Sequence, residues 1–316
     1  MSGDDRTGAV APVDGEQAGE GEQVGDEGTI TLGDRWTYDW AARRKPAIHP
    51  LRTPAGHVLT RMSPPDHPWH RGLWFTIKYV NEENFWEEVQ PYGVLRHVAE
   101  PDLRGPDETG RTSLTGTVRW IRPDQSSVAF EERRRLTHVP LGDDAYAIDL
   151  DLSLTAVDHT VVRSEPFTTW GGYGGLTLRG REDWHDTRLL LADGSVHDRV
   201  VADRSPWCDL TGPVGDGDDA VGGLAIFDHP GNPRHPVPWY GSTRAATYGD
   251  DGWSNFLNAA LLFEEPLAVP AGERLRIRHR VVVHDDWWDV DRVGSAWDDY
   301  VNEAKTRATG RRSDHG

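Results

Sequence analysis

Residues 145–157, AYAIDLDLSLTAV, decide the fold class because apolar and polar side chains alternate along them. The apolar face comprises Tyr146, Ile148, Leu150, Leu152 and Leu154, and the polar face comprises Asp149, Asp151 and Ser153. Alternation with a period of two over this length predicts a strand with one buried face. Residues 273–286, ERLRIRHRVVVHDD, repeat the pattern with arginines on the polar face. The chain therefore contains long, half-buried antiparallel strands.

Shorter apolar stretches separated by turn signals predict many more strands. They include residues 29–32, 35–40, 112–121, 128–139, 174–179, 222–229 and 258–269. Turn residues stand between them, as in Ala192-Asp193-Gly194 and Pro270-Ala271-Gly272. Many short strands with regular turns predict an all-β fold. We expect a large antiparallel β-sandwich, of which a mutarotase-like supersandwich is one form, with a C-terminal helix.

Only the C-terminal end has a helical pattern. Its apolar stripe comprises Val293, Trp297, Tyr300, Val301 and Ala304. This stripe predicts a helix over about residues 293–308, with Ser295 as its cap and Gly310 as its stop.

The ends of the chain differ from the middle in composition. Residues 1–28 are acidic, glycine-rich and almost free of large apolar side chains, so we expect a disordered tail. Residues 29–310 are expected to form a single sandwich domain that includes the helix, and residues 311–316 a loose tail. No internal repeat divides the chain.

Charge and cysteine content exclude several classes of partner and site. The 316 residues include 52 acidic and 34 basic side chains, for a formal net charge of −18. Such a surface repels phosphate backbones and anionic lipid, so we expect neither nucleic acid nor membrane as a partner. The single cysteine, Cys208, excludes a disulfide framework and a cysteine-rich metal site. With no signal peptide pattern and no long apolar run, a cytoplasmic location is expected.

The densest group of chemically active side chains lies in residues 64–75, PPDHPWHRGLWF. The prolines predict an extended loop, and from His70 onward the alternation predicts a strand. Asp66 can orient one imidazole through its ring N–H, which fixes the tautomer. A regular strand would point His67 and His70 to opposite faces, which is poor geometry for a shared metal ion unless a loop redirects His67.

The next segment, NFWEEV from Asn84, brings further candidates. If it pairs back as a hairpin partner, Glu88 would approach His70. An imidazole and a carboxylate beside one substrate are the minimum for general acid–base chemistry. The alternative is structural: a histidine bonded to a carboxylate, with Trp86 packed over it.

A second segment, residues 228–240, DHPGNPRHPVPWY, has the same residue types as the first. Its candidates are Asn232, Arg234, His235 and Trp239. Because both loops are stiffened by prolines and combine imidazole, guanidinium and indole, we expect them to face each other across one pocket lined by His70 and His235. Two unconnected His–carboxylate bonds are the alternative.

Between the two loops lies FTTWGGYGGLTLRG, residues 167–180. Its glycines permit close backbone approach, but neither a Walker lysine nor a helical pattern follows, so it is not a phosphate-binding loop. We expect Trp170 and Tyr173 to be walls of the pocket, with core packing as the alternative.

Residues 66–75, 84–88, 228–240 and 256–285 resemble the bacterial family labelled methane oxygenase PmoA-like, and the similarity spans about residues 30–290. The resemblance implies that members of this family are often found beside sugar oxidoreductases and sugar isomerase-like proteins. The sandwich with loop histidines also resembles the galactose-mutarotase group, in which a His and a Glu serve as acid and base on a sugar ring. This sequence lacks the histidine motifs of that group, so the second resemblance concerns the fold.

We therefore expect an enzyme that acts on a carbohydrate or keto-sugar by proton transfer, as an epimerase, lyase or hydrolase. The expected catalytic residues are His70, Glu88 and His235. The expected substrate-binding residues are Asp66, His67, Arg71, Trp74, Trp86, Trp170, Tyr173, Asn232, Arg234 and Trp239. Arg71 or Arg234 would stabilise a developing oxyanion.

Two alternatives stay open. One is a metalloenzyme, an oxygenase if the family label holds, using His67, His70 and His235 with a carboxylate. The other is a sugar-binding module without chemistry. We predict no cofactor and no tightly held metal, although a divalent metal would suit the first alternative. The sequence does not predict the oligomeric state.

Overall fold

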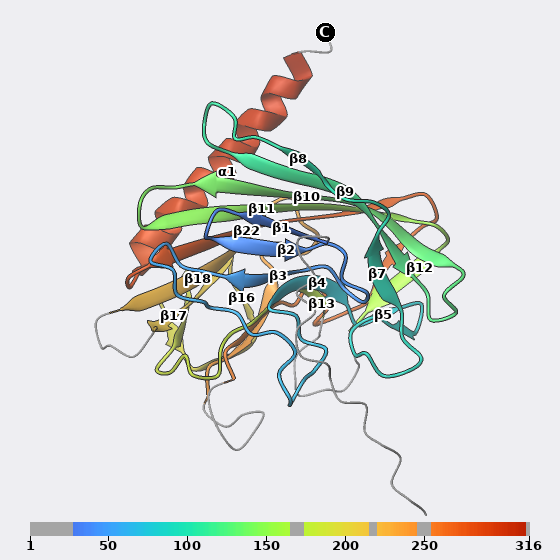
Figure 1. The fold of residues 1–316 in the computed structure, drawn as a ribbon, viewed down its shortest axis with the longest axis horizontal. Helices are drawn as coiled ribbons and strands as arrows, with labels where there is room; N and C mark the ends of the chain where they lie inside the picture. The colour runs from blue at the N-terminus through green and yellow to red at the C-terminus, as the bar shows by residue number, and fades with distance from the viewer. Residues whose placement is uncertain (1–27, 165–173, 215–219, 245–253, 314–316) are drawn as a thin grey trace, which may run out of the picture.

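The computed structural model describes residues 28–164, 174–214, 220–244 and 254–313. Two large antiparallel sheets lie face to face, a small third sheet lies at one end, and a helix runs along the outside (Figure 1). The expected all-β sandwich with a C-terminal helix is confirmed. Apart from Gly28, the expected N-terminal tail lies outside the described residues.

The first sheet has eight strands. In spatial order they are β1 (Thr29–Leu32), β2 (Trp36–Asp39), β3 (Ala47–Leu51), β4 (Leu73–Ile77), β13 (Gly174–Arg179), β20 (Phe256–Ala259), β19 (Pro238–Ser242) and β16 (Arg199–Arg204).

The second sheet has ten strands. In spatial order they are β15 (Val196–His197), β14 (Arg188–Leu191), β17 (Trp207–Pro213), β18 (Val221–Asp228), β22 (Arg274–Asp285), β11 (Ala145–Ala156), β10 (Val128–Pro140), β9 (Thr112–Ile121) and β7 (Val94–His97), with β8 (Asp102–Arg104) also paired to β9. The small sheet is β21 (Leu267–Val269), β12 (Thr160–Arg163), β5 (Tyr79–Val80) and β6 (Glu83–Asn84).

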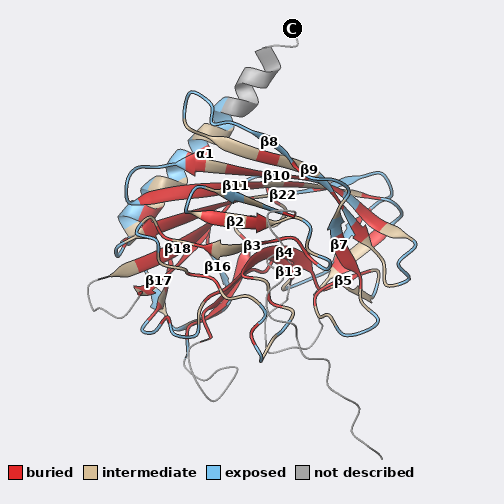
Figure 2. Ribbon diagram, viewed as in Figure 1, coloured by how far each residue is buried: buried red, intermediate tan, exposed pale blue. Residues whose placement is uncertain are grey.

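The main core lies between the two large sheets, where the strands are buried (Figure 2). The predicted apolar face of β11, from Tyr146 to Leu154, points into this core. Leu275, Ile277, Val281 and Val283 of β22 do the same. The alternation read from these two segments therefore sets the inner and outer faces of the larger sheet.

A polar cluster also lies between the sheets. Glu132 and Arg134 share the inner face of β10 with Leu136, and both are buried. Arg134 Nε donates to Glu132 Oε1 at 2.6 Å, and Trp120 Nε1 donates to Glu132 Oε2 at 2.8 Å. Tyr38 lies beside Arg134, with its hydroxyl 2.8 Å from His97 Nε2. Each charge is thus neutralised inside the core, which removes much of the cost of burying it.

The helix α1 (Val290–Ser313) packs on the outer face of the ten-stranded sheet. Val293, Tyr300 and Val301 of its predicted stripe are buried there against Ala147, Phe227 and Val282, among others. The predicted helix is confirmed, but its ends differ. Asp289 Oδ1 accepts the N–H of Arg292 at 2.9 Å and so caps the helix in place of Ser295. The helix also continues past Gly310 to Ser313.

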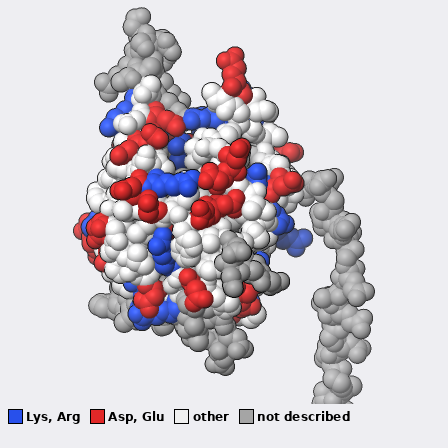
Figure 3. Space-filling model, turned by 90° about the vertical axis from the view of Figure 1, so that its left-hand side faces the viewer, with Lys and Arg blue, Asp and Glu red and all other residues white. Residues whose placement is uncertain are grey.

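The surface shown in Figure 3 carries acidic and basic side chains close together, without separation into regions of one sign. No helix within the described ranges is long and apolar enough to cross a membrane.

Candidate functional site

The loop before β4 brings its two histidines together. The N–H of His67 bonds to Pro64 O at 3.0 Å, and the N–H of His70 bonds to His67 O at 2.9 Å. These successive turns stack the two imidazoles with ring centroids 4.6 Å apart and planes 21° from parallel. Strand alternation would have separated them, so the loop redirects His67. Gly72 allows the chain to enter β4, because its φ is +72° and a Cβ there would lie 2.7 Å from Ile48 O.

His67 is oriented by a carboxylate. Its Nδ1 donates to Asp66 Oδ2 at 2.9 Å, and Arg179 Nη2 from β13 donates to the same oxygen at 2.7 Å. Burial disfavours the charge on Asp66, but the bond from His67 and the charge on Arg179 outweigh it and lower the pKa of Asp66. With Nδ1–H held by the carboxylate, Nε2 is the basic nitrogen of a neutral His67 ring.

His70 lies deeper than His67, within a cluster of aromatic rings. Its side chain is 2% exposed, whereas that of His67 is 21% exposed. The neighbouring ring centroids are those of Trp74 at 5.2 Å, Phe256 at 5.3 Å, Trp86 at 6.1 Å and Trp69 at 6.4 Å. Burial above all, then repulsion by His67 when that ring is protonated and by Arg179, lowers the pKa of His70 well below its usual value, so the ring is neutral at pH 7.

Several buried polar atoms around His70 have no hydrogen-bond partner among the residues that the structure describes. They are both ring nitrogens of His70, Trp74 Nε1 and Asn258 Oδ1. Trp74, Thr177 and Asn258 are direct cross-strand neighbours on β4, β13 and β20, so they share the outer face of the eight-stranded sheet. Asn258 Nδ2 donates to Thr177 Oγ1 at 2.7 Å, which fixes the orientation of the amide. Each such buried atom costs about 1–3 kcal/mol unless a ligand or water bonds to it.

Glu88 lies close to this cluster but is held by cations. Arg44 and Arg71 donate to its carboxylate, and Lys45 Nζ lies 3.4 Å from Oε1. Burial disfavours its charge, but Lys45 and the two arginines lower the pKa of Glu88. Lys45 also donates to the carbonyl oxygens of Trp69 and Trp86, and burial lowers its pKa to about 8. His70 has no bond to Glu88, so the expected His70–Glu88 pair does not form in the structure.

The remaining predicted residues of the first loop have structural contacts. Arg71 is bonded to Glu88 and Ser63, so it is not a free clamp for an oxyanion. Trp74 and Trp86 are almost fully buried with ring centroids 5.5 Å apart, whereas the partly exposed indole of the cluster belongs to Trp69. Trp170 and Tyr173 lie outside the described residues.

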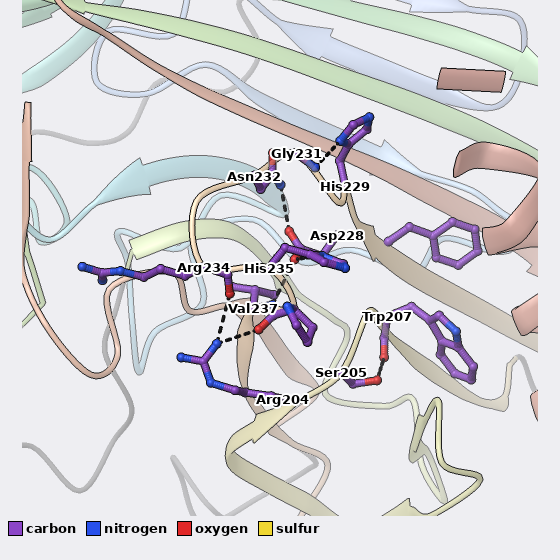
Figure 4. Close-up of polar contacts among 12 residues, drawn as sticks. Arg204, Ser205, Trp207, Asp228, His229, Gly231, Asn232, Arg234, His235 and Val237 are labelled. Carbon is purple, nitrogen blue, oxygen red and sulfur yellow. Dashed lines mark hydrogen bonds and ion pairs between the residues drawn. The ribbon is translucent and has the colours of Figure 1, made fainter. Parts of the chain in front are cut away.

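The second predicted loop is built around Asp228 (Figure 4). This carboxylate is 1% exposed and accepts three hydrogen bonds: from His235 Nδ1 at 2.7 Å, Val237 N at 2.9 Å and Asn232 Nδ2 at 2.8 Å. Asn232 also bonds to both backbone groups of Arg278 in β22, which ties the loop to the larger sheet. Asp228 therefore organises the backbone of its own loop.

The other predicted residues of the second loop also have structural roles. Arg234 donates to the carbonyl oxygens of Leu261, Glu265 and Pro266. Trp239 is fully buried between the sheets, where its Nε1 donates to Ser205 O at 2.8 Å. Neither side chain points to an open site.

The structure does not bring the two loops together. The His235 ring stacks on Trp297 of α1, with centroids 6.3 Å apart and planes 4° from parallel. The helix lies on the outer face of the ten-stranded sheet, whereas His70 lies on the outer face of the eight-stranded sheet. The ring contacts and hydrogen bonds of His70 and His235 share no residue. The expectation of one pocket between the loops is therefore corrected to two separate environments.

The described parts of the chain contain no group of three or more His, Cys, Asp or Glu side chains arranged to hold a metal ion. The carboxylate bonded to the stacked pair His67–His70 is that of Asp66, and it is already bonded to Arg179.

Sequence reasoning missed the polar residues Lys45, Arg179 and Asn258, and also the aromatic residues Trp69 and Phe256. The segment GGLTLR did contain a signal for one of them. Alternation places Thr177 and Arg179 opposite the apolar pair Leu176 and Leu178, and an arginine in so apolar a strand suggests a buried partner. Lys45 ends a run of basic residues that reads as an exposed turn, and Asn258 stands among apolar residues, so neither has such a signal.

Two solved structures align with most of this chain at low similarity. The alpha-galactosidase from Lactobacillus brevis is 8% identical, with a TM-score of 0.44, over 84% of this chain and 40% of that one. The galactose mutarotase related enzyme from Lactobacillus acidophilus is 10% identical, with a TM-score of 0.38, over 81% of this chain and 96% of that one. This chain thus spans less than half of the alpha-galactosidase. No curated protein matches the sequence.

The family comparison corrects one expectation. The model that matches residues 29–298 describes a family of unknown function, and nothing indicates the methane oxygenase PmoA-like family that the motifs resembled. Short motifs rich in His, Pro and Trp were therefore not sufficient to assign the family. The chain belongs to the family of unknown function DUF6807.

Proposed function

We propose that the outer face of the eight-stranded sheet around His67 and His70 binds a carbohydrate and that His67 exchanges a proton with it. The observation that carries this proposal is the set of buried polar atoms without partners on His70, Trp74 and Asn258. They include a donor on Trp74, an acceptor on Asn258, and one of each on a neutral imidazole. Hydroxyl groups both donate and accept, so a polyhydroxylated ligand matches this mixture.

The aromatic side chains support the same ligand class. Trp69 is partly exposed at the edge of a cluster that contains Trp74, Trp86, Tyr240 and Phe256. A sugar ring has apolar C–H faces and a polar edge, so it packs on an indole while its hydroxyls reach polar groups. An aromatic edge beside unpaired polar atoms suits that combination.

Within this proposal His67 is the acid–base residue, which revises the role expected for His70. Asp66 and Arg179 fix the ring of His67 and its tautomer, and the ring is partly exposed. His70 is neutral and buried, so it would serve as a hydrogen-bonding group beneath the substrate. Glu88 would position Lys45 and Arg71 instead of transferring protons.

Because the carboxylate of Glu88 is already paired with cations, a second candidate is also favoured: a sugar-binding module that catalyses no reaction. An epimerase or hydrolase commonly needs two acid–base groups, and the carboxylate expected as the partner is held by three cations. Binding and turnover must therefore be measured separately.

The test uses a panel of aldoses and keto-sugars, including glucose, galactose, fructose and tagatose. Saturation-transfer NMR reports binding, and incorporation of deuterium from D₂O into carbon positions reports proton transfer. We expect exchange with at least one sugar, lost in His67→Ala while binding is retained. His235→Ala is the matched control, because it removes an imidazole from another His–Asp pair. Binding without exchange in the wild type would support the module, and absence of binding would contradict both candidates.

A further inference from the structure

The outer face of the ten-stranded sheet carries a second group of unpaired polar atoms. His229 Nε2 and Arg278 Nε are both buried and have no hydrogen-bond partner in the described part of the chain. The two residues are neighbours, because the N–H of His229 bonds to Arg278 O across the end of β18 and β22. Arg278 also packs against the loop: a Cβ on Gly231 would lie 2.2 Å from its Nη2 and 3.3 Å from His229 Nδ1.

The local hydrogen bonds fix which atoms are donors. Gly231 N donates to His229 Nδ1 at 2.8 Å (Figure 4), so a neutral ring carries its hydrogen on Nε2. Burial, then the charge on Arg278, lowers the pKa of His229 to about 4, so the ring is neutral at pH 7. The guanidinium Nε is always a donor. The buried N–H groups of two neighbouring residues therefore lack an acceptor among the described residues, and His229 is only 8% exposed.

The surrounding charges are positive. In the strand register Arg135, Asp151 and Arg278 lie side by side across β10, β11 and β22. Asp151 is bonded to Arg276, the next outward-facing residue on β22. Arg135 and Arg278 make no ion pair with any residue in the described ranges. Asp151 lies between the two arginines and attracts both, but its direct hydrogen bonds go to Arg276, so Arg135 and Arg278 share one carboxylate that is already bonded elsewhere.

Arg135 is exposed and lines two hollows on the outer face of the sheet. One hollow of about 550 Å³ on the sheet surface is lined by Arg133, Arg135, Ser153 and Arg276, among others. A groove of about 1220 Å³ between α1 and the sheet is lined by Arg135, Arg280 and Glu303, among others. In that groove the cations are paired, since Glu303 bonds to both Arg111 and Arg280. Arg135 and Arg278, in contrast, have no direct ion pair with a described residue.

We propose that His229, Arg278 and Arg135 form a binding site for an oxyanion, supplied either by the carboxylate of a sugar acid or by a small inorganic anion. An anionic acceptor would bond to both buried N–H groups and balance the unpaired guanidinium charge. A water molecule would satisfy a donor without balancing the charge. The site lies on the opposite sheet from His67, so it stands independently of the function proposed above.

The test measures binding of sodium glucuronate and sodium sulfate to the full chain by calorimetry. Ionic strength is held constant with sodium chloride, and glucose serves as the uncharged control. We expect saturable binding of at least one anion, weakened at least tenfold in Arg278→Met. The same loss is expected in His229→Asn, which keeps an acceptor for Gly231 N but lacks the Nε2 donor. Arg119→Met is the charge-matched control on the same sheet, because Arg119 is exposed and paired with Glu131.

Binding of glucuronate alone would assign the site to a sugar acid, and binding of both anions to a small oxyanion. Absence of saturable binding to the wild type would overturn the proposal, as would equal affinity in Arg278→Met. Equal weakening in Arg119→Met would reduce the effect to general surface charge and would also overturn it. His67→Ala should bind the anions as the wild type does, whether or not the sugar site exists.

Discussion

Asp66–His67 and Asp228–His235 are the same pair of groups in two different settings. In both, imidazole Nδ1 donates to a carboxylate, at 2.9 Å and 2.7 Å respectively. Asp228 is almost fully buried and also bonds to Val237 N and Asn232, so it holds a loop in shape. Asp66 is partly exposed and shared with Arg179, and the ring that it orients lies on His70, whose nitrogens have no partners.

The comparison teaches that residue type and spacing do not distinguish a structural His–Asp pair from a functional one. What distinguishes them is the surroundings of the imidazole. His235 stacks on the indole of a packed helix, whereas His67 lies beside buried polar atoms that still need partners. The following predictions test that distinction.

The largest expected difference is in proton transfer. His67→Ala should lower the rate of deuterium incorporation into a responsive sugar by about 10²–10⁴-fold, the usual contribution of a general acid–base group. His235→Ala should leave that rate within about twofold. NMR of the sugar in D₂O measures both rates. Equal losses in the two variants would remove the distinction between the pairs.

The next difference is in the free energy of unfolding. Here the Asp228–His235 pair should matter more than the Asp66–His67 pair. Asp228→Ala should lower the free energy of unfolding by about 3–5 kcal/mol, because it leaves several buried N–H donors without an acceptor. Asp66→Ala should lower it by about 1–2 kcal/mol, because Asp66 and His67 are partly exposed and water can take the place of the carboxylate. Urea unfolding at pH 7 gives both values. A larger cost for Asp66→Ala would mean that the first loop is the structural one.

A smaller effect is expected where His235 meets the helix. Trp297→Leu should lower the free energy of unfolding by about 1 kcal/mol, because it removes the stacked ring while keeping an apolar side chain. Proton transfer should be unchanged, because α1 packs on the other sheet. Urea unfolding and the exchange assay check the two parts. A loss of exchange in this variant would link the helix to the sugar site.

The smallest difference concerns pH. The folded-state pKa of Asp66 is below its ordinary value, so its contribution to stability is fully present above about pH 4, the unfolded value. That contribution is lost as the pH falls through the lower folded-state pKa. The stability difference between the wild type and Asp66→Asn should therefore shrink between pH 5 and pH 3. Urea unfolding across this range measures it, and a difference that grows on acidification would contradict the ionised pair.

The strands could be predicted from the sequence because burial on one face produces a period of two. Residues 145–156 and 274–285 form β11 and β22, with the expected inner faces. The same parity could have placed Glu132 and Arg134 in the core beside Leu136, because all three share a face. The charges of Glu132 and Arg134 argued against a place in the core. Their partner Trp120 lies on another strand, so the local sequence does not indicate the contact that allows their burial.

The sequence predicted several residues of the candidate site, but it did not predict which of them bond to one another. The PPDHPWH loop does contain Asp66 bonded to a histidine, yet only the two turns from Pro64 and His67 determine which histidine it is. Arg179 and Asn258 reach the cluster through sheet order, since β13 and β20 follow β4 in space but not in sequence. Sheet order depends on long-range packing, which local patterns do not encode.

Strand β10 contains five consecutive charged residues, Glu131 to Arg135, and only Glu132 and Arg134 face inward. A slip of one residue against a neighbouring strand would turn Glu131, Arg133 and Arg135 inward, away from Trp120 and Tyr38. The dehydrated interior would then hold an unbalanced charge where it now holds a neutral pair. A sheet with a shifted strand could not pack against the opposite sheet during folding. We therefore expect the Glu132–Arg134 pair to select the correct strand register more than to add net stability.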